Sequence, residues 1–249
     1  MYYYDNLDST NIKAFELAKE GVSHGTLIVA NSQNAGKGRR GRSWTSEPGT
    51  GIYMSLVLRP DIAPQQAPGL TLVAALSVAL AIKTECEGLS EGAVEIKWPN
   101  DIILHKKKVC GILTEMYLDG TKVDFVIVGI GVNVHQKEFP AEIKATATSL
   151  DIETGGGNSK EALIEKIQIF FKTYYEKYVK TGDLSDIKQE YERHLTNINK
   201  QVKVIDPAGE YSGIAKGITE KGELIVETKE GIRYVESGEV SVRGIYGYV

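Results

Sequence analysis

The side chains best suited to chemistry in this sequence are cations in a glycine-rich segment, residues 36–42 (GKGRRGR). Glycine lets the backbone approach a ligand, and arginine offers a planar fork of donors that matches phosphate or carboxylate oxygens. The segment therefore predicts an exposed, flexible loop that binds an anion. It is no P-loop, because no Gly-Lys-Ser/Thr follows. A solvated chance cluster of charge and a nucleic-acid contact are the alternatives.

A second polar segment, residues 97–101 (KWPND), stands between two expected strands. Pro99 stiffens the turn, Asn100 can donate and accept hydrogen bonds, and Asp101 adds a carboxylate. Each of the two tryptophans lies beside a basic segment, where its ring can pack on a flat heterocycle or a guanidinium. The alternative is a Trp-Pro corner of the core with solvated charges.

Two further segments carry weaker signals. Residues 106–108 are three lysines that precede a β-rich run, and Lys108, the last of them, can turn its ammonium inward while Lys106 and Lys107 stay in water. Residues 129–133 (GIGVN) close an apolar strand with two glycines and an amide. They lack the third glycine and the following helix of a dinucleotide fingerprint.

Metal and nucleophile chemistry find little support. The four histidines, His24, His105, His135 and His194, lie far apart without ligand spacing, so no metal centre is expected. No serine, cysteine or aspartate stands in a recognisable nucleophile setting. We expect the chemistry to depend on cations and on positioning.

The composition is that of an ordinary globular protein. The chain has 249 residues, is 42% hydrophobic and 25% charged, and carries a formal net charge of −4, which argues against a surface built for nucleic acid. Cys86 and Cys110 are too few for a disulfide framework and predict two buried, reduced thiols. No signal peptide is visible, and the apolar stretch 70–82 falls short of the roughly 20 residues of a membrane span. We expect a cytoplasmic protein that contacts no membrane.

Periodicity and turn residues predict the elements that must position these segments. Helices are expected over residues 10–20, 69–85, 159–180 and 184–196, with 69–85 fully buried. Strands are expected over 27–30, 52–58, 94–97, 102–104, 110–118 and 122–134. Five short strands follow, over 202–205, 211–218, 224–228, 232–236 and 240–242, and suggest a small SH3-like β-barrel. The chain is therefore divided into an α+β domain, 1–197, and a β domain, 198–249.

In their order, these segments resemble the biotin–protein ligase family. The matching landmarks are residues 8–11 (DSTN), Gln33, 36–42, 97–101, Lys108 with Gly111, and 129–133. The resemblance implies a class II synthetase-like mixed sheet with helices, of the biotin/lipoate ligase type, and a small SH3-like C-terminal domain. It also implies a biotin–[biotin carboxyl-carrier protein] ligase, which joins biotin to ATP as an adenylate and then passes biotin to a lysine of a carrier domain. Biotin and ATP are its substrates, Mg²⁺ accompanies ATP, and dimerisation is common in the family.

The resemblance also assigns residues. For biotin it implies Ser9, Thr10, Asn11, Gln33, Lys37, Gly38, Arg39, Lys108 and Gly111. For ATP it implies Arg40, Arg42, Trp44, Lys97, Asn100, Asp101 and Asn133. Among these, Arg39 and Lys108 are the expected catalytic residues, and Asp101 is an expected contact of Mg²⁺.

Two features depart from the family. Lys37 stands where the family's loop usually has arginine, so the charge remains but the bidentate fork is lost. Residues 8–11 lie almost at the start of the sequence and leave no room for the DNA-binding winged helix of some members, so the ligase-only form, without DNA binding, is expected. A lipoate or octanoate ligase relative and a nucleic-acid-binding module are the rival functions.

Overall fold

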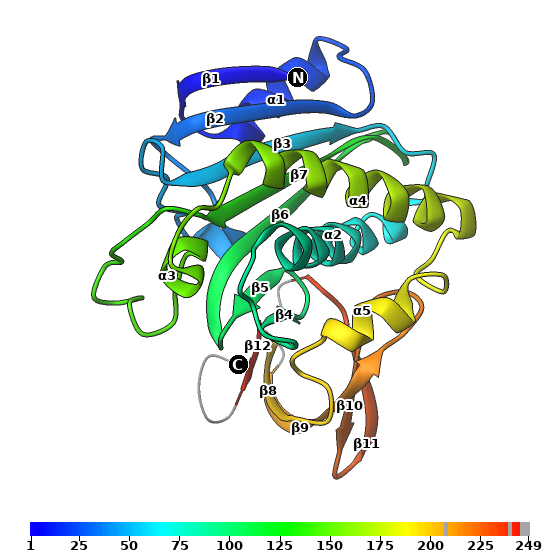
Figure 1. Ribbon diagram of the computed structural model, residues 1–249. Coiled ribbons are helices and arrows are strands. Elements are labelled where there is room, and N and C mark those ends of the chain that lie inside the picture. Colours follow the sequence, from blue (N-terminus) through cyan, green and yellow to red (C-terminus); the bar gives the residue numbers. More distant parts are fainter. Residues whose placement is uncertain (207–208, 239–240, 245–249) are drawn as a thin grey trace.

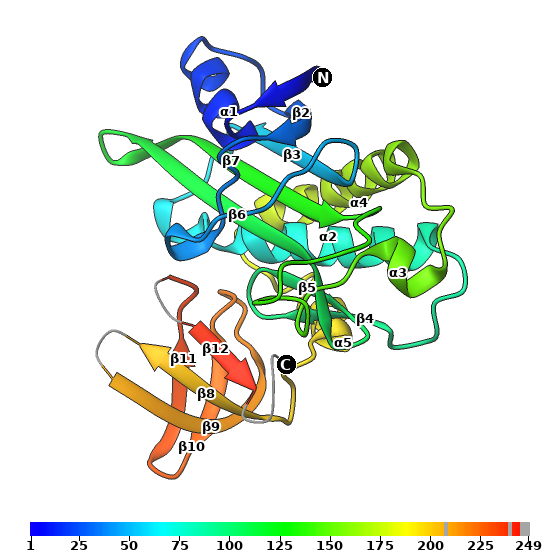
Figure 2. The same cartoon turned by 90° about the vertical axis from the view of Figure 1, so that its left-hand side faces the viewer.

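The computed structural model describes residues 1–206, 209–238 and 241–244. Within these ranges the strands form two sheets, one of seven strands and one of five, and helices pack on the larger sheet (Figures 1 and 2). The α+β class expected from the sequence is confirmed, and the SH3-like character of the smaller part stays a prediction.

The larger sheet has the strand order β1-β2-β3-β7-β6-β5-β4. Its strands are β1 (Tyr2–Leu7), β2 (Thr26–Gln33), β3 (Gly51–Leu58), β4 (Val94–Lys97), β5 (Asp101–Leu104), β6 (Lys107–Asp119) and β7 (Lys122–Asn133). Strand β1 pairs in parallel with β2, and the other neighbours are antiparallel. The sequence did not predict β1, because this mostly exposed edge strand mixes tyrosines with Asp5 and Asn6 and shows no apolar alternation.

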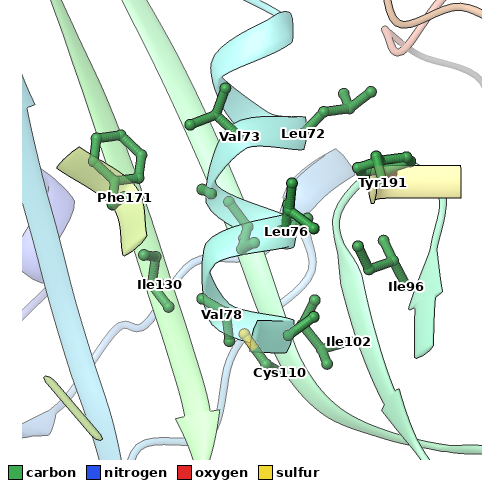
Figure 3. Packing of buried hydrophobic residues seen from close by; sticks show 14 of the residues in the cluster. Leu72, Val73, Leu76, Val78, Ile96, Ile102, Cys110, Ile130, Phe171 and Tyr191 are labelled. Carbon is green, nitrogen blue, oxygen red and sulfur yellow. The ribbon is translucent and has the colours of Figure 1, made fainter. Parts of the chain in front are cut away.

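One face of this sheet is covered by α2 (Gly69–Glu85) and α4 (Lys160–Thr181). Figure 3 shows buried side chains on both sides of α2, which face Ile130 and Phe171 on one side and Ile96 and Tyr191 on the other. The bounds of α2 and its burial are as predicted. Helix α2 has no polar face because the sheet, α4 and α5 (Lys188–His194) enclose it on all sides.

The apolar helix also bears on the membrane prediction. Together with the preceding turn, residues 64–85 are long and apolar enough to cross a membrane, so the expectation that this stretch is too short was wrong. In the fold, however, 78% of its apolar window is buried against other elements. Its apolar character is therefore accounted for by packing in the core.

The opposite face of the sheet is only partly covered, by α1 (Thr10–Lys19). Ala14 and Leu17 of α1 pack against Ile28 and Phe125 in a separate small core. Helix α1 begins at Thr10, as predicted, and Ser9 is its N-cap. Past the N-terminal end of α1, the alternation of side chains along β6 and β7 places the small residues of these strands on the same face of the sheet as Phe125. Because these side chains are small, they leave a hollow on this face.

Three short helical elements stand outside the main helices. Helix α3 (Leu150–Thr154) was not predicted, because five residues are too few to show helical periodicity. Its ends still follow local rules: the Ser149 hydroxyl accepts from the Ile152 amide, and Gly155 adopts a left-handed conformation with φ of 85°. Two 3₁₀ turns, Arg39–Gly41 and Pro64–Gln66, complete the helical elements of the described ranges.

The smaller sheet is antiparallel, with the order β11-β10-β9-β8-β12. Its strands are β8 (Gln201–Asp206), β9 (Gly209–Ile218), β10 (Leu224–Thr228), β11 (Gly231–Val235) and β12 (Ser241–Gly244). Five strands were predicted, and residue 240, at the start of the last predicted strand, lies outside the described residues. The buried side chains of this sheet belong to the same continuous core as α2. The two sheets are thus packed together (Figure 2).

Candidate active site

The floor of the hollow is built where α1 begins and β2 ends. The Thr10 amide donates to Gln33 Oε1 at 2.8 Å, and Thr10 Oγ1 lies 3.2 Å from the same oxygen. Gln33 Nε2 donates to Ser46 Oγ at 2.8 Å. Ser9 and Thr10 are buried. These bonds hold hydroxyl and amide groups in fixed directions toward the hollow, as the recognition of a small polar ligand requires.

The next residue of α1, Asn11, is held by the protein through both ends of its amide. Its Nδ2 donates to Glu115 Oε2 at 2.6 Å, and its Oδ1 lies 2.6 Å from Ser55 Oγ. A Cβ atom added to Gly129 of β7 would collide with Asn11 Oδ1. Gly129 is therefore required so that Asn11 can lie against the sheet.

The glycine-rich segment folds back on itself instead of forming an open loop. Lys37 and Ser43 form an isolated antiparallel bridge, and the Gly38 amide donates to the Arg42 carbonyl at 2.7 Å. Between them lies the 3₁₀ turn, in which Arg40 has a left-handed φ of 59°. The segment is a largely exposed loop, and the added finding is the short turn at its centre. The turn sends Arg39 inward while Arg40 and Arg42 stay exposed.

Arg39 is partly buried and connects three parts of the chain. Its Nη1 donates to Asn100 Oδ1 at 2.7 Å, and its Nη2 donates to the carbonyl of Gly238, after β11, at 2.6 Å. Burial lowers the pKa of the guanidinium below its usual value, although the nearby Asp101 carboxylate opposes that shift. An arginine remains charged under such conditions. A desolvated cation is thus held at the mouth of the hollow.

Lys108 of β6 supplies a second cation beside the hollow. Its Nζ lies 2.7 Å from Asp101 Oδ1 and 5.2 Å from the centre of the Trp44 ring. A β-bulge interrupts the pairing of β5 with β6 directly after Lys108, and the added residue turns this side chain to the same face as Gly111. Lys106 is exposed. The lysine that the sequence singled out is therefore the one that faces the hollow.

Trp44 closes the hollow from the side of the turn. A Cβ atom added to Gly131 would lie 2.6 Å from the indole Nε1, and one added to Gly111 would lie 2.9 Å from Cζ3. Both glycines are therefore needed for the indole to lie flat on β6 and β7. The buried Nε1–H has no hydrogen-bond acceptor among the described residues. Its position leaves a donor ready for a polar ligand atom.

The other tryptophan joins the two sheets. Trp98 is 2% exposed, and its Nε1 donates to the Gly222 carbonyl at 2.9 Å. Its burial fits the alternative of a Trp-Pro corner in the core, and it also lines the larger cleft. Its neighbour Lys97 is buried as well and does not carry the solvated charge of that alternative.

The predicted residues gather in two adjoining pockets. The smaller, of about 50 Å³, is lined by all nine residues assigned to biotin: Ser9, Thr10, Asn11, Gln33, Lys37, Gly38, Arg39, Lys108 and Gly111. The larger cleft, of about 480 Å³, is lined by all seven assigned to ATP: Arg40, Arg42, Trp44, Lys97, Asn100, Asp101 and Asn133. Arg39 and Lys108 line both and so stand at the junction.

Other lining residues were not predicted. In the larger cleft these are chiefly Gln136, Glu138, Phe139, Pro140, Ile143, Thr146 and Ala147, from the segment between β7 and α3. The segment reaches the site because the Lys108 amide donates to the Thr146 carbonyl at 2.7 Å. It contains no motif, so no signal in the sequence indicated it. Ser55 and Glu115, which support Asn11, were missed because a lone polar residue in a strand has no distinctive spacing.

Comparison with known proteins gives consistent matches. Residues 3–133 match the biotin/lipoate A/B protein ligase family, and residues 198–243 match the biotin protein ligase C terminal domain. The chain is 41% identical over 244 residues to the bifunctional ligase/repressor BirA of Bacillus subtilis (strain 168), which covers 97% of this chain and 74% of that protein. It is 32% identical to the biotin--[acetyl-CoA-carboxylase] ligase of Paracoccus denitrificans, over 95% of this chain and 98% of that one.

A solved structure is similar to this chain over nearly its whole length. The biotin protein ligase from Aquifex aeolicus in complex with biotin and ATP is similar with a TM-score of 0.83 and 35% identity, over 97% of each chain.

Proposed function

The chain belongs to the biotin/lipoate A/B protein ligase family, and we propose that its smaller pocket holds biotin and its larger cleft holds ATP. The chain is an ATP-dependent biotin–protein ligase. The observation that supports this division most strongly is the junction: the Lys108 ammonium and the Arg39 guanidinium line both pockets at once. A reaction between two bound anions needs cations at the place where they meet.

In the first step, a carboxylate oxygen of biotin attacks the α-phosphorus of ATP, and pyrophosphate leaves. The two reacting groups are both anionic, so their approach is opposed by charge. Lys108 is placed to neutralise the biotin carboxylate, and then to stabilise the ester oxygen of the adenylate. The protein contributes chiefly alignment and charge stabilisation, because the mixed anhydride forms directly between the substrates.

On the biotin side, Ser9, Thr10 and Gln33 face the ureido ring with hydroxyl and amide groups. Gly111 lets the ligand chain approach the backbone of β6. Lys37 and Gly38 would cover the ligand, since they line the smaller pocket from the opposite wall. In the second step, the closed turn keeps water from the adenylate until a lysine amine attacks the carbonyl carbon, AMP leaves and the amine loses a proton.

On the ATP side, the exposed cations Arg40 and Arg42 point to the phosphates, and Trp44 offers a flat surface to the adenine. Mg²⁺ usually enters such sites bound to phosphates, and needs only one or two carboxylates from the protein. Asp101 fits that requirement as the carboxylate of the cleft closest to Lys108. When bound, the ion neutralises phosphate charge. Asn100 and Asn133 would orient the nucleotide.

The smaller sheet contributes through its contact with Arg39. We assign residues 1–197 to the binding of both substrates and 198–249 to carrier docking or to ordering the ATP side, because the Gly238 carbonyl holds the Arg39 guanidinium. Residues 245–249 of this second domain lie outside the described residues. The acceptor in this proposal is a biotin carboxyl carrier domain of a carboxylase, and support comes from the name of the Paracoccus relative, which gives acetyl-CoA carboxylase as the protein that it acts on. The cytoplasm is the place of action in this proposal.

The test is biotin-dependent exchange of pyrophosphate into ATP. The wild-type chain should catalyse exchange with biotin and fail to do so with lipoate at the same concentration. Exchange that depends on lipoate would instead support the lipoate-ligase alternative. A chain that binds nucleic acid and shows no exchange with either acid would refute the proposal altogether.

A further inference from the structure

A carboxylate that lines neither pocket, that of Glu115, is bonded to the floor of the smaller one. Glu115 lies in the middle of β6 and is partly buried. Its Oε2 accepts a hydrogen bond from Asn11 Nδ2 at 2.6 Å. Asn11 and its neighbour Thr10 both line the smaller pocket. The carboxylate is thus bonded directly to a lining residue without lining the pocket itself.

Glu115 determines which way the Asn11 amide points. An ionised carboxylate can only accept hydrogen bonds, so the amide must turn its NH₂ group toward it. The Leu113 carbonyl, 3.5 Å from the same nitrogen, is also an acceptor and favours the same orientation. The Asn11 oxygen consequently faces Ser55, whose Oγ lies 2.6 Å away.

The orientation of the Asn11 amide affects the hydrogen bonding of Thr10, because the buried Ser55 hydroxyl lies between the two side chains. Ser55 is fully buried and has a single proton, which it must give to Asn11 Oδ1 because that oxygen has none to offer. Toward Thr10 Oγ1, 2.8 Å away, Ser55 then offers a lone pair. The Thr10 proton goes to Ser55 or to Gln33 Oε1, both inside the protein. Thr10 therefore presents lone pairs to the pocket.

We propose that Glu115 is a positioning residue that makes Thr10 a hydrogen-bond acceptor for a ureido N–H of biotin. The inference rests on the proposed binding of biotin in the smaller pocket. Without the carboxylate, the Asn11 NH₂ group keeps only the Leu113 carbonyl, whose 3.5 Å distance is too long to fix the amide, so the amide can rotate by half a turn and donate to Ser55. Ser55 would then donate to Thr10 and could no longer accept the Thr10 proton, so that proton could turn into the pocket, where the ligand needs a lone pair. The effect is on binding of the ureido ring, since Glu115 touches none of the groups that face ATP.

The experiment compares biotin and ATP kinetics of Glu115→Ala in pyrophosphate exchange, with calorimetric titration of biotin alone. We expect the KM and Kd for biotin to rise about ten-fold, a typical loss for one charge-anchored hydrogen bond, with kcat and the KM for ATP unchanged. Desthiobiotin keeps the ureido ring and should lose the same factor. Glu115→Gln should recover most of the affinity, because its amide oxygen can accept from Asn11.

Glu20→Ala is the matched control, because it removes the same charge from the exposed end of α1 and should change nothing. If Glu115→Ala does not fold, the comparison of Glu115→Gln with Ser55→Ala still applies. Ser55→Ala breaks the relay and should weaken biotin binding, while Glu115→Gln should not. Wild-type biotin affinity in Ser55→Ala would overturn the relay.

A double-mutant cycle with Thr10→Val shows whether Glu115 affects biotin binding through Thr10 or by a route that does not involve Thr10. In the Thr10→Val background, Glu115→Ala should have little further effect on biotin binding. A full additional loss there would overturn the proposal, as would an equal rise in the KM for ATP. If Thr10→Val itself leaves biotin affinity intact, biotin does not contact Thr10, and the positioning role of Glu115 is refuted as well. Absence of biotin-dependent exchange in the wild type would instead refute the proposed function.

Discussion

Replacing Lys108 with alanine should impair adenylate formation far more than it impairs folding. The Lys108 side chain is 25% exposed, and its ammonium lies 2.7 Å from the Asp101 carboxylate at the junction of the two pockets. Removing it takes away the cation expected to face the biotin carboxylate. It also leaves the Asp101 charge without its ammonium partner at the point where two anions must meet.

The size of the loss follows from the kind of bond. A charge-assisted hydrogen bond contributes about 1.5–3 kcal/mol, which corresponds to a factor of roughly 10 to 150 in rate or affinity. A partly exposed ion pair such as that of Lys108 with Asp101 adds only about 0–1 kcal/mol to stability. The variant should therefore keep its melting temperature and lose at least about ten-fold in kcat/KM for biotin-dependent exchange.

The assay is pyrophosphate exchange at varied biotin, with thermal unfolding measured on the same samples. Lys107→Ala and Lys106→Ala are the matched controls, since they remove identical charges one and two residues away. Both should stay close to wild type. Equal activity of all three variants, or a selective loss in Lys107→Ala, would show that the assignment to Lys108 is wrong.

Three further predictions concern other parts of the chain. Arg39→Gly should still form the adenylate but let it escape, so that added serum albumin becomes biotinylated in a streptavidin blot; labelling confined to the carrier would contradict this role. Trp98→Phe removes the indole bond to Gly222 and should cost about 1–3 kcal/mol in denaturant unfolding with unchanged biotin affinity; unaltered stability would show that the bond does not matter. Burial raises the pKa of the Cys86 thiol to about 11 and that of Cys110 still further, so iodoacetamide should label both only after denaturation; native labelling of Cys110 at the denatured rate would contradict its burial.

The elements that the sequence predicted well are those with strong patterns of their own. Helix α2 was located to the residue because residues 69–85 are apolar nearly all round, which is the pattern of a fully buried helix. The hairpins of the smaller sheet were marked by glycine turns. By contrast, β1 was missed because its burial pattern depends on a neighbour on one side only.

The residues of the site were likewise predicted where they belong to motifs, and were harder to predict where they depend on tertiary structure. Its motif residues were identified through their order along the chain, and the structure brings them into two adjoining pockets. Which lysine faces the pockets could not follow from alternation, because two-residue periodicity from Gly111 points to Lys107. The β-bulge after Lys108 in the pairing of β5 with β6 reverses that result, and alternation along one strand does not show such a bulge.

Arg39 illustrates a further limit. Its charge and glycine neighbours indicated an anion contact, but its bonds to Asn100 and Gly238 join segments far apart in sequence. Nothing in either partner segment signals the other. Such contacts arise from packing of the two sheets, which sequence patterns do not specify.

The most direct test of the central claim is the intact mass of a biotin carboxyl carrier domain after incubation with the chain, biotin and ATP. We expect a gain equal to one biotinyl group on the acceptor lysine. We expect no gain when ATP is left out, when lipoate replaces biotin, or when that lysine is changed to arginine. An unmodified carrier in the complete mixture, or a gain that does not require ATP, would contradict the claim.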